Sequence, residues 1–188
     1  VDWTVLVMLT FGGFLLSGAS VCINQIMEKD LDAVMDRTRN RPLPTGRISS
    51  REATVFALAC LLMSLVILWI FTNPLTVMLS IVSMVLYSFI YTPLKRVGPI
   101  AVFVGAIPGA LPPLLGWIAA TGSITYEALI IFGIQFIWQF PHFWAIAWVA
   151  DDDYKKAGFK LLPSGGGKDL NTAIQIMIYT MFLIPLGL

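Results

Sequence analysis

The sequence predicts an all-α protein, a polytopic bundle of transmembrane helices. Hydrophobic residues make up 57% of the 188-residue chain and charged residues only 12%, whereas soluble domains carry about 25% charged residues. Long apolar runs recur along the chain, and about 20 such residues suffice to cross a bilayer. The formal net charge of +1 does not suggest a nucleic-acid partner. The composition therefore excludes both a soluble globular domain and a disordered chain.

Six segments are apolar enough to be predicted as membrane spans. Short turns at 72–74 and 119–125 separate two pairs of them, because proline and glycine interrupt helices. The third segment is short, and the sixth reaches the last residue. The six predicted spans are Trp3 to Met27, Ala53 to Phe71, Leu75 to Tyr91, Ile100 to Ile118, Tyr126 to Ala150, and Thr172 to Leu188.

The basic residues predict how the spans are oriented. All twelve lysines and arginines lie in the loops 28–52, 92–98 and 151–169, and the two short turns have none. By the positive-inside rule, these three loops are expected on the cytoplasmic side. Both ends of the chain are then expected on the opposite side.

A first acidic cluster begins at the end of the first span. Asn24, Glu28, Asp32 and Asp36 are spaced by four, which places them on one stripe of a helix. Carboxylates at this spacing repel one another unless a cation lies among them. Mg²⁺ prefers oxygen ligands and is bound by one or two carboxylates together with substrate phosphates. Taken alone, the cluster is better explained as a wet helix end whose acids pair with nearby basic residues.

A second acidic cluster, Asp151-Asp152-Asp153, follows the fifth span on the same predicted side. Taken alone, it is better explained as an ordinary charged loop. Two carboxylate groups on different helices can, however, hold metal ions with a diphosphate between them. The presence of both clusters on one face therefore favours diphosphate chemistry.

Basic side chains on the same face supply positive charge for such an anion. Arginine can bind phosphate oxygens through two parallel hydrogen bonds. Arg47 and Arg51 are sufficiently explained by membrane topology. The candidates for diphosphate binding are Arg37, Arg41, Lys95 and Arg96.

The first acidic cluster and the residues that follow it resemble the first aspartate-rich motif of the UbiA-type intramembrane prenyltransferases. The resemblance covers Asn24 to Asp32 and then Arg37 to Gly46, which reads RTRNRPLPTG. The family joins an allylic diphosphate to a lipophilic acceptor, with Mg²⁺ held by two acidic motifs in a nine-helix bundle. Gln25 stands where the family usually has aspartate, and Glu28 where aspartate is common.

Other segments resemble the haem-prenylating branch of this family. They are YTPLKR at 91–96, the proline-rich segment 105–117, WQFPHFW at 138–144, and DDYKKAG at 152–158, which resembles the second acidic motif. The resemblance implies farnesyl transfer from farnesyl diphosphate to a vinyl group of haem B, with haem O and diphosphate as products. It also implies Mg²⁺, a bacterial inner membrane, and an association with haem A synthase or terminal oxidase assembly.

The resemblance extends along the whole chain. We therefore expect one prenyltransferase domain over 1–188, which is a fragment of the nine-helix fold. Its first helix and last two helices are expected to be missing.

The resemblance also assigns roles to residues. His142, inside the fifth span, and Trp138 are expected to contact haem, because an ionisable group within a membrane suggests a function; packing is the alternative explanation. The expected catalytic residues and metal ligands are Asn24, Glu28, Asp32, Asp152 and Asp153. The expected diphosphate-binding residues are Arg37, Arg41, Tyr91, Lys95, Arg96 and Lys156.

Two other functions remain open. A prenyltransferase that acts on an aromatic quinone precursor would differ in its acceptor. A transporter would be expected to have acidic residues near the middle of the membrane. Here all acids except Asp2 and Glu127 lie at predicted cytoplasmic helix ends or loops, which favours an enzyme.

Overall fold

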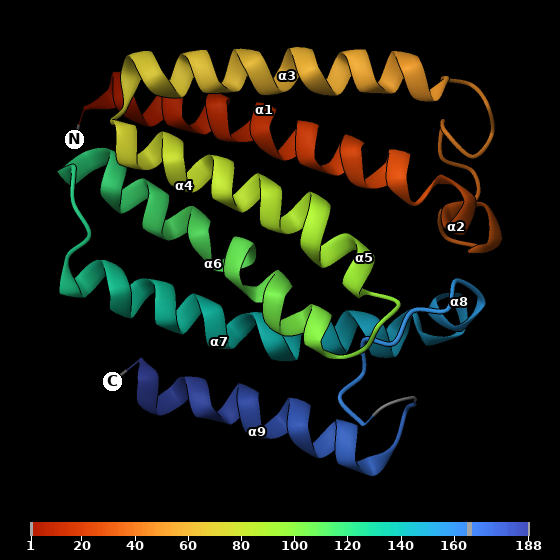
Figure 1. Ribbon diagram of the computed structural model, residues 1–188. Helices are drawn as coiled ribbons and strands as arrows, with labels where there is room; N and C mark the ends of the chain where they lie inside the picture. The colour runs from red at the N-terminus through yellow and green to blue at the C-terminus, as the bar shows by residue number, and fades with distance from the viewer. Residues whose placement is uncertain (1, 165–166, 188) are drawn as a thin grey trace.

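The computed structural model describes residues 2–164 and 167–187, and all regular elements in these ranges are helices. Consecutive long helices run back and forth and pack side by side (Figure 1). The longer helices are α1 (Trp3–Met27), α3 (Ser50–Phe71), α4 (Pro74–Val85), α6 (Ile100–Thr121), α7 (Tyr126–Val149) and α9 (Leu170–Leu186). The short ones are α2 (Lys29–Val34), the π-helix η1 (Leu86–Tyr91), α5 (Thr92–Leu94) and α8 (Asp151–Lys156).

The predicted polytopic helical bundle is confirmed, but the count of six spans is corrected. Among the described residues, five helical segments are long and apolar enough to cross a membrane. They are α1, α3, α6, α7 and the continuous run from α4 through η1 to α5, Pro74–Leu94. Helix α9 has 17 residues, which span about 25 Å at 1.5 Å per residue. That length falls short of a hydrocarbon core of about 30 Å. The predicted end of this span, Leu188, lies outside the described residues.

The three loops that carry the basic residues lie at one end of the bundle. Figure 1 shows α2, α5 and α8 together at that end. The loops are far apart in the sequence, and the back-and-forth course of the long helices gathers them. The two acidic clusters and the basic residues of these loops are thereby placed at the same end.

Small residues allow α1 and α3 to approach closely. A Cβ atom at Gly12 would lie 2.9 Å from Leu68 Cδ2, so a side chain there would force the buried Leu68 side chain of α3 to shift. The Ser64 hydroxyl donates a hydrogen bond to the Gly12 carbonyl at 2.7 Å. Glycine and serine at a helix interface are typical of membrane proteins, where close packing replaces the hydrophobic driving force.

Helices α6 and α7 are joined by a hydrogen bond that compensates for a proline. Pro113, inside α6, has no amide hydrogen, so the Gly109 carbonyl lacks its usual helical donor. Gln139 of α7 is buried, and its Nε2 donates to that carbonyl at 2.9 Å. A Cβ atom at Gly109 would lie 2.6 Å from the Gln139 side-chain amide. The glycine, the proline and the glutamine therefore act as one unit.

A π-helical turn, η1, precedes Pro93. In an uninterrupted α-helix, the proline ring would clash with the carbonyl of Phe89. Instead, the Thr92 amide donates to the Tyr87 carbonyl five residues earlier, and the Thr92 hydroxyl donates to the same oxygen at 3.0 Å. Such turns are rare in proteins overall, and those that occur are often found at functional sites. This one places the rings of Tyr87 and Tyr91 with their centroids 5.6 Å apart.

Candidate active site

A cavity of about 190 Å³ lies where α1, η1, α7 and α8 meet. We call it the carboxylate cavity. Its walls combine acidic and basic side chains with aromatic rings. The lining residues are Asn24, Glu28, Asp32, Met35, Arg37, Arg41, Tyr87, Tyr91, Lys95, Phe143, Ile146, Tyr154, Phe159 and Leu161.

Three residues of the predicted acidic stripe line this cavity together. Helix α1 ends at Met27 and α2 begins at Lys29. The backbone hydrogen bonds nevertheless continue with a spacing of four, from the Glu28 amide to the Asn24 carbonyl at 2.9 Å and from the Asp32 amide to the Glu28 carbonyl at 2.7 Å. The helical spacing is thereby kept across the break, and Asn24, Glu28 and Asp32 stay on one side.

Asp36 does not belong to this stripe, and its prediction as the fourth member is wrong. Helix α2 ends at Val34, so the helical spacing stops before residue 36. The Asp36 side chain is 61% exposed and forms ion pairs with Arg39 and Lys156. It therefore faces the surface and does not line the cavity.

Each of the two buried carboxylates is paired through one oxygen. Glu28 and Asp32 are only 5% and 1% exposed. The Lys95 Nζ atom lies 2.9 Å from Glu28 Oε2, and an Arg41 guanidinium nitrogen lies 2.8 Å from Asp32 Oδ2. The Asn24 amide also donates to Glu28 Oε2, and to the Thr92 hydroxyl, at 2.9 Å each.

The other oxygen of each carboxylate is open. Among the described residues, Glu28 Oε1 and Asp32 Oδ1 are buried without a hydrogen-bond partner. A buried polar atom without a partner is costly, and an oxygen-seeking cation would remove that cost. No three acidic, histidine or cysteine side chains in the described part of the chain form a preassembled metal cluster. The two open oxygens nevertheless fit Mg²⁺, which characteristically takes its remaining ligands from substrate and water.

Lys95 is held firmly in the cavity wall. Its Nζ atom lies 5.0 Å from the centroid of the Tyr91 ring and 5.4 Å from that of Phe159, within the range of cation–π attraction. Burial lowers the pKa of Lys95, and the Glu28 carboxylate opposes this shift. The Lys95 carbonyl also accepts a hydrogen bond from the Lys160 amide at 2.8 Å. The loops after α5 and α8 are therefore fixed to each other at this lysine.

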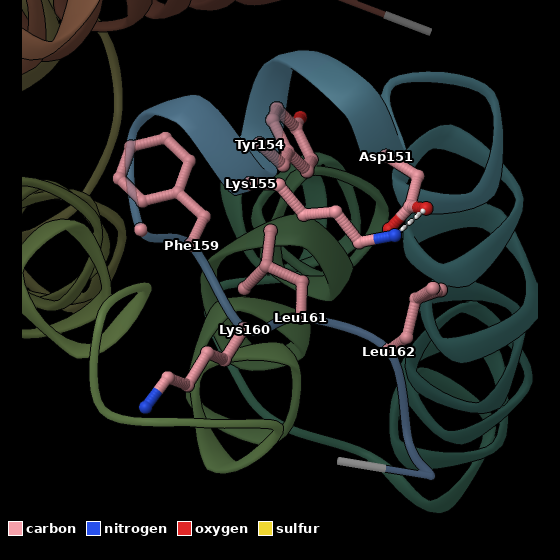
Figure 2. A pocket seen from close by; sticks show the side chains of 8 residues that line it. Asp151, Tyr154, Lys155, Phe159, Lys160, Leu161 and Leu162 are labelled. Carbon is pink, nitrogen blue, oxygen red and sulfur yellow. Dashed lines mark hydrogen bonds and ion pairs between the residues drawn. The ribbon is translucent and has the colours of Figure 1, made fainter. Parts of the chain in front are cut away.

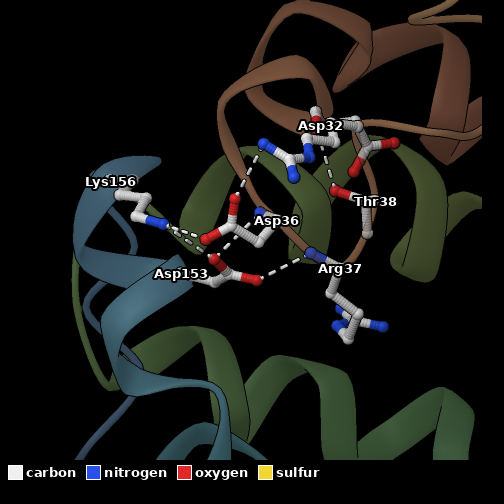
Figure 3. A network of polar contacts seen from close by, with 7 residues as sticks. Asp32, Asp36, Arg37, Thr38, Asp153 and Lys156 are labelled. Atoms are coloured by element: carbon white, nitrogen blue, oxygen red, sulfur yellow. Dashed lines mark hydrogen bonds and ion pairs between the residues drawn. The ribbon is translucent and has the colours of Figure 1, made fainter.

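The second acidic motif holds the backbone of the loop after α2. The Asp153 oxygens accept hydrogen bonds from the amides of Asp36 and Arg37, each at 2.9 Å (Figure 3). The amide of Arg37, and then that of Asp36, lower the pKa of Asp153. Asp152 is exposed, and in the described ranges its side chain makes no hydrogen bond or ion pair. The structure therefore does not bring Asp152 and Asp153 into the carboxylate cavity.

Asp151 is a buried residue of this motif that the sequence analysis did not assign. Its Oδ2 atom pairs with Lys155 Nζ at 2.7 Å (Figure 2). The pair borders a separate pocket of about 220 Å³ that also contacts Tyr154 and Phe159. Tyr154 and Phe159 line the carboxylate cavity as well, so α8 and the segment that follows it separate the two spaces.

The predicted basic residues divide into two groups. Arg37, Arg41 and Lys95 line the carboxylate cavity, as does Tyr91. Arg96 is exposed and lines a different cavity, of about 450 Å³. Lys156 forms ion pairs with the side chains of Asp36 and Asp153.

Gln25, which replaces the usual aspartate of the family motif, lies away from this site. Gln25 and Cys22 line a fourth cavity, of about 490 Å³, which faces α3. The charge that Gln25 lacks is therefore not lost from the carboxylate cavity.

A largely apolar cavity of about 260 Å³ adjoins the carboxylate cavity. The two share Tyr87 and Phe143 as lining residues. Phe143 belongs to the WQFPHFW segment, for which packing was the alternative explanation, whereas Tyr87 was not predicted, although it lies four residues before the predicted Tyr91. The remaining lining residues are Leu16, Ser17, Ser20, Val21, Ser83, Gly105, Pro108, Gly109 and Pro112.

His142 and Trp138 form a stacked pair on an exposed face of α7. Their ring centroids are 4.4 Å apart and their planes differ by 15°. Ile146, four residues after His142, lines the carboxylate cavity. Residues spaced by four share a helix face, so this stripe extends from the carboxylate cavity along α7 to Trp138.

The helical bundle agrees with a family match that extends over the whole length of the chain. The chain belongs to the UbiA prenyltransferase family, with residues 1–188 matched. It is 52% identical over 187 residues to "Protoheme IX farnesyltransferase" of Cytophaga hutchinsonii, which covers 100% of this chain and 65% of that protein. It is also 52% identical over 188 residues to the protein of the same name from Christiangramia forsetii, 62% of which is covered. The chain thus spans less than two thirds of the length of these curated relatives.

Two solved structures confirm the fold. The apo structure of a UbiA homolog from Aeropyrum pernix superposes with a TM-score of 0.78 and 21% identity, over 100% of this chain and 73% of that one. A UbiA homolog from Archaeoglobus fulgidus bound to DMAPP and Mg²⁺ gives a TM-score of 0.70 and 20% identity, over 99% of this chain and 63% of that one.

Proposed function

We propose that the protein transfers a farnesyl group from farnesyl diphosphate to a vinyl group of haem B, giving haem O and diphosphate. The observation that carries this proposal is the pair of open, buried carboxylate oxygens on Glu28 and Asp32. Both residues line the carboxylate cavity, which is also lined by basic side chains and adjoins a largely apolar cavity. The names of the relatives support haem, rather than a quinone precursor, as the acceptor.

Glu28 and Asp32 would hold Mg²⁺ through their open oxygens, with oxygens of the diphosphate completing its coordination. When bound, Mg²⁺ would stabilise the negative charge that develops on the leaving diphosphate. The homolog from Archaeoglobus fulgidus that is bound to DMAPP and Mg²⁺ supports the choice of metal. The metal-binding roles of Asn24, Asp152 and Asp153 remain predictions.

The other residues of the cavity would bind and orient the donor. Arg37 and Lys95 line the cavity and would neutralise diphosphate charge. The prenyl tail would occupy the adjoining cavity, away from water. Tyr87 and Phe143 lie at the junction of the two spaces, where their ring faces would stabilise an allylic cation. The diphosphate-binding roles of Arg96 and Lys156 remain predictions.

The bond between C1 of the farnesyl group and the diphosphate oxygen breaks, and the electron pair leaves with the diphosphate. A haem vinyl carbon then forms a bond to C1, which leaves a cation on the other vinyl carbon. Water adds to that carbon and loses a proton, so the product carries a hydroxyethylfarnesyl group.

Incubation of the purified protein in nanodiscs with haem B, farnesyl diphosphate and Mg²⁺ tests the proposal. Mass analysis should show haem that has gained one farnesyl group and one hydroxyl group, and EDTA should abolish the product. A parallel reaction offers an aromatic quinone precursor in place of haem. Prenylation of that precursor alone would replace haem with a quinone acceptor, whereas no product with either acceptor would favour a transporter.

His142→Ala is expected to raise the apparent KM for haem by about tenfold, which corresponds to the loss of roughly 1.4 kcal/mol. The reason is its place on the exposed stripe with Trp138, beyond the residues that would hold the diphosphate. The KM for farnesyl diphosphate should change little. Ala145→Ser, a nearby exposed change on α7, is the control. Equal changes in both KM values, or no change in either, would assign His142 to packing alone.

We propose that the protein lies in a bacterial inner membrane with its basic loops on the cytoplasmic side. The positive-inside rule supports this orientation. Single cysteines introduced at Thr45 and Ser164 in a variant without Cys22 and Cys60 should be labelled from the same side by a membrane-impermeant maleimide. Labelling of the two positions from opposite sides would contradict the topology. Association with haem A synthase or terminal oxidase assembly remains a prediction.

A further inference from the structure

We infer that Arg41 is an exchangeable counter-ion, which holds Asp32 in the absence of substrate and transfers to the diphosphate when substrate binds. This inference rests on the metal–diphosphate site proposed above. It adds that release of Asp32 by Arg41 couples metal binding to diphosphate binding.

The two ion pairs of the carboxylate cavity are similar in length but differ in how firmly the cation is held. Lys95 is 11% exposed in its side chain and lies between the rings of Tyr91 and Phe159. The Arg41 side chain is 32% exposed and comes from the loop between α2 and α3. In the described part of the chain, its guanidinium makes only the bond to Asp32. Arg41 is therefore the cation that can leave.

Arg41 also has the donor groups needed to bind the diphosphate after it leaves Asp32. A guanidinium carries five N–H donors in a planar fork, and Asp32 accepts from a single nitrogen. The remaining donors are available to a diphosphate in the same cavity, where bidentate pairing with phosphate oxygens is favourable. After the transfer, both Asp32 oxygens would be open to a metal ion.

Charge balance makes the exchange cooperative. Glu28 and Asp32 are matched by Lys95 and Arg41, so the four charges sum to zero. A divalent cation that arrives alone meets carboxylates whose charge is already compensated and two nearby positive charges. A diphosphate that arrives with the metal draws Arg41 away. The negative charge of Asp32 is then uncompensated and available to the metal. By linkage, each ligand must then raise the affinity for the other by the same factor.

Mn²⁺ titration followed by electron paramagnetic resonance tests this inference on the purified protein in nanodiscs. In the parent, Mn²⁺ alone should bind weakly, and saturating farnesyl thiodiphosphate should raise its affinity by about tenfold or more. In Arg41→Gln, Mn²⁺ alone should bind about tenfold more tightly than in the parent, because Asp32 has lost its counter-ion. Farnesyl thiodiphosphate should bind more weakly to the same variant. Opposite effects on the two ligands distinguish exchange from general damage to the site.

Arg39→Gln is the matched control, because it removes one positive charge from the same loop at a side chain that pairs with exposed Asp36. Its Mn²⁺ affinity should equal that of the parent. Unchanged or weaker Mn²⁺ binding in Arg41→Gln would overturn the inference. Should that variant fail to fold, Arg41→Lys replaces it: Mn²⁺ alone should stay weak while thiodiphosphate affinity falls, and tighter Mn²⁺ binding would overturn the inference. The Mn²⁺ titration measures binding of the metal and of a donor analogue without haem or turnover, so failure of the haem assay alone would refute only the proposed reaction.

Discussion

Glu28→Gln and Asp32→Asn are each expected to lower kcat by about 10²–10³-fold, the usual effect of removing one group that stabilises developing charge. Each amide keeps the carboxylate's shape, and its carbonyl can still accept a hydrogen bond from Lys95 or Arg41. The substitution removes the negative charge and, with it, the affinity of the open oxygen for Mg²⁺. Steady-state rates with saturating haem, farnesyl diphosphate and Mg²⁺ measure the effect.

Asp30→Asn provides the control for these variants. Asp30 lies on α2, between the two carboxylates in sequence, but it is exposed and does not line the carboxylate cavity. Its rate should stay close to that of the parent. Rates near the parent value for both Glu28→Gln and Asp32→Asn would exclude the carboxylate cavity as the metal site.

Gln139→Met is expected to destabilise the bundle by about 1–2 kcal/mol, because it leaves the Gly109 carbonyl unpaired inside a membrane-spanning helix. The same substitution should cost much less in a Pro113→Ala background. Alanine at position 113 restores the amide hydrogen that the helix lacks, so the Gly109 carbonyl no longer depends on Gln139. Equilibrium unfolding of the four proteins in mixed micelles gives the coupling between the two residues.

The control for this cycle is Gln135→Met, one turn earlier on α7. Gln135 is partly buried, and its side chain makes no hydrogen bond to another described residue. Its substitution should have the same small effect with either residue at position 113. Equal losses from Gln139→Met in both backgrounds would show that Gln139 acts by packing and does not replace the missing donor.

The local part of the site was predictable from the sequence because it depends on helical spacing. Asn24, Glu28 and Asp32 line one cavity, as a spacing of four requires. The same rule failed at Asp36, because α2 ends two residues earlier. The sequence also suggested a wet helix end, whereas Glu28 and Asp32 are buried. They share their cavity with residues of η1, α7 and α8, whose positions no local pattern specifies.

The contacts between distant segments could not be predicted from the sequence. Asp153 belongs to the second acidic motif, but its carboxylate accepts hydrogen bonds from backbone amides that lie 116 and 117 residues away in the chain. Nothing in the local sequence distinguishes a carboxylate that binds backbone amides from one that binds a metal ion. Tyr87 and Phe143 likewise meet only after the chain has folded. Their shared position between the two cavities requires the packing of η1 against its neighbours.

The π-helical turn sets the phase of the residues that follow it. Each residue advances an α-helix by about 100°, so one residue fewer between 86 and 91 would rotate Thr92 and Lys95 away from Asn24 and Glu28. Substitution of side chains cannot correct such a rotation, since it belongs to the backbone. The number of residues in this segment is therefore constrained separately from their identity. An insertion or deletion there would disturb the cavity in a way that a point substitution would not. The cavity depends on how many residues form the turn as well as on which residues they are.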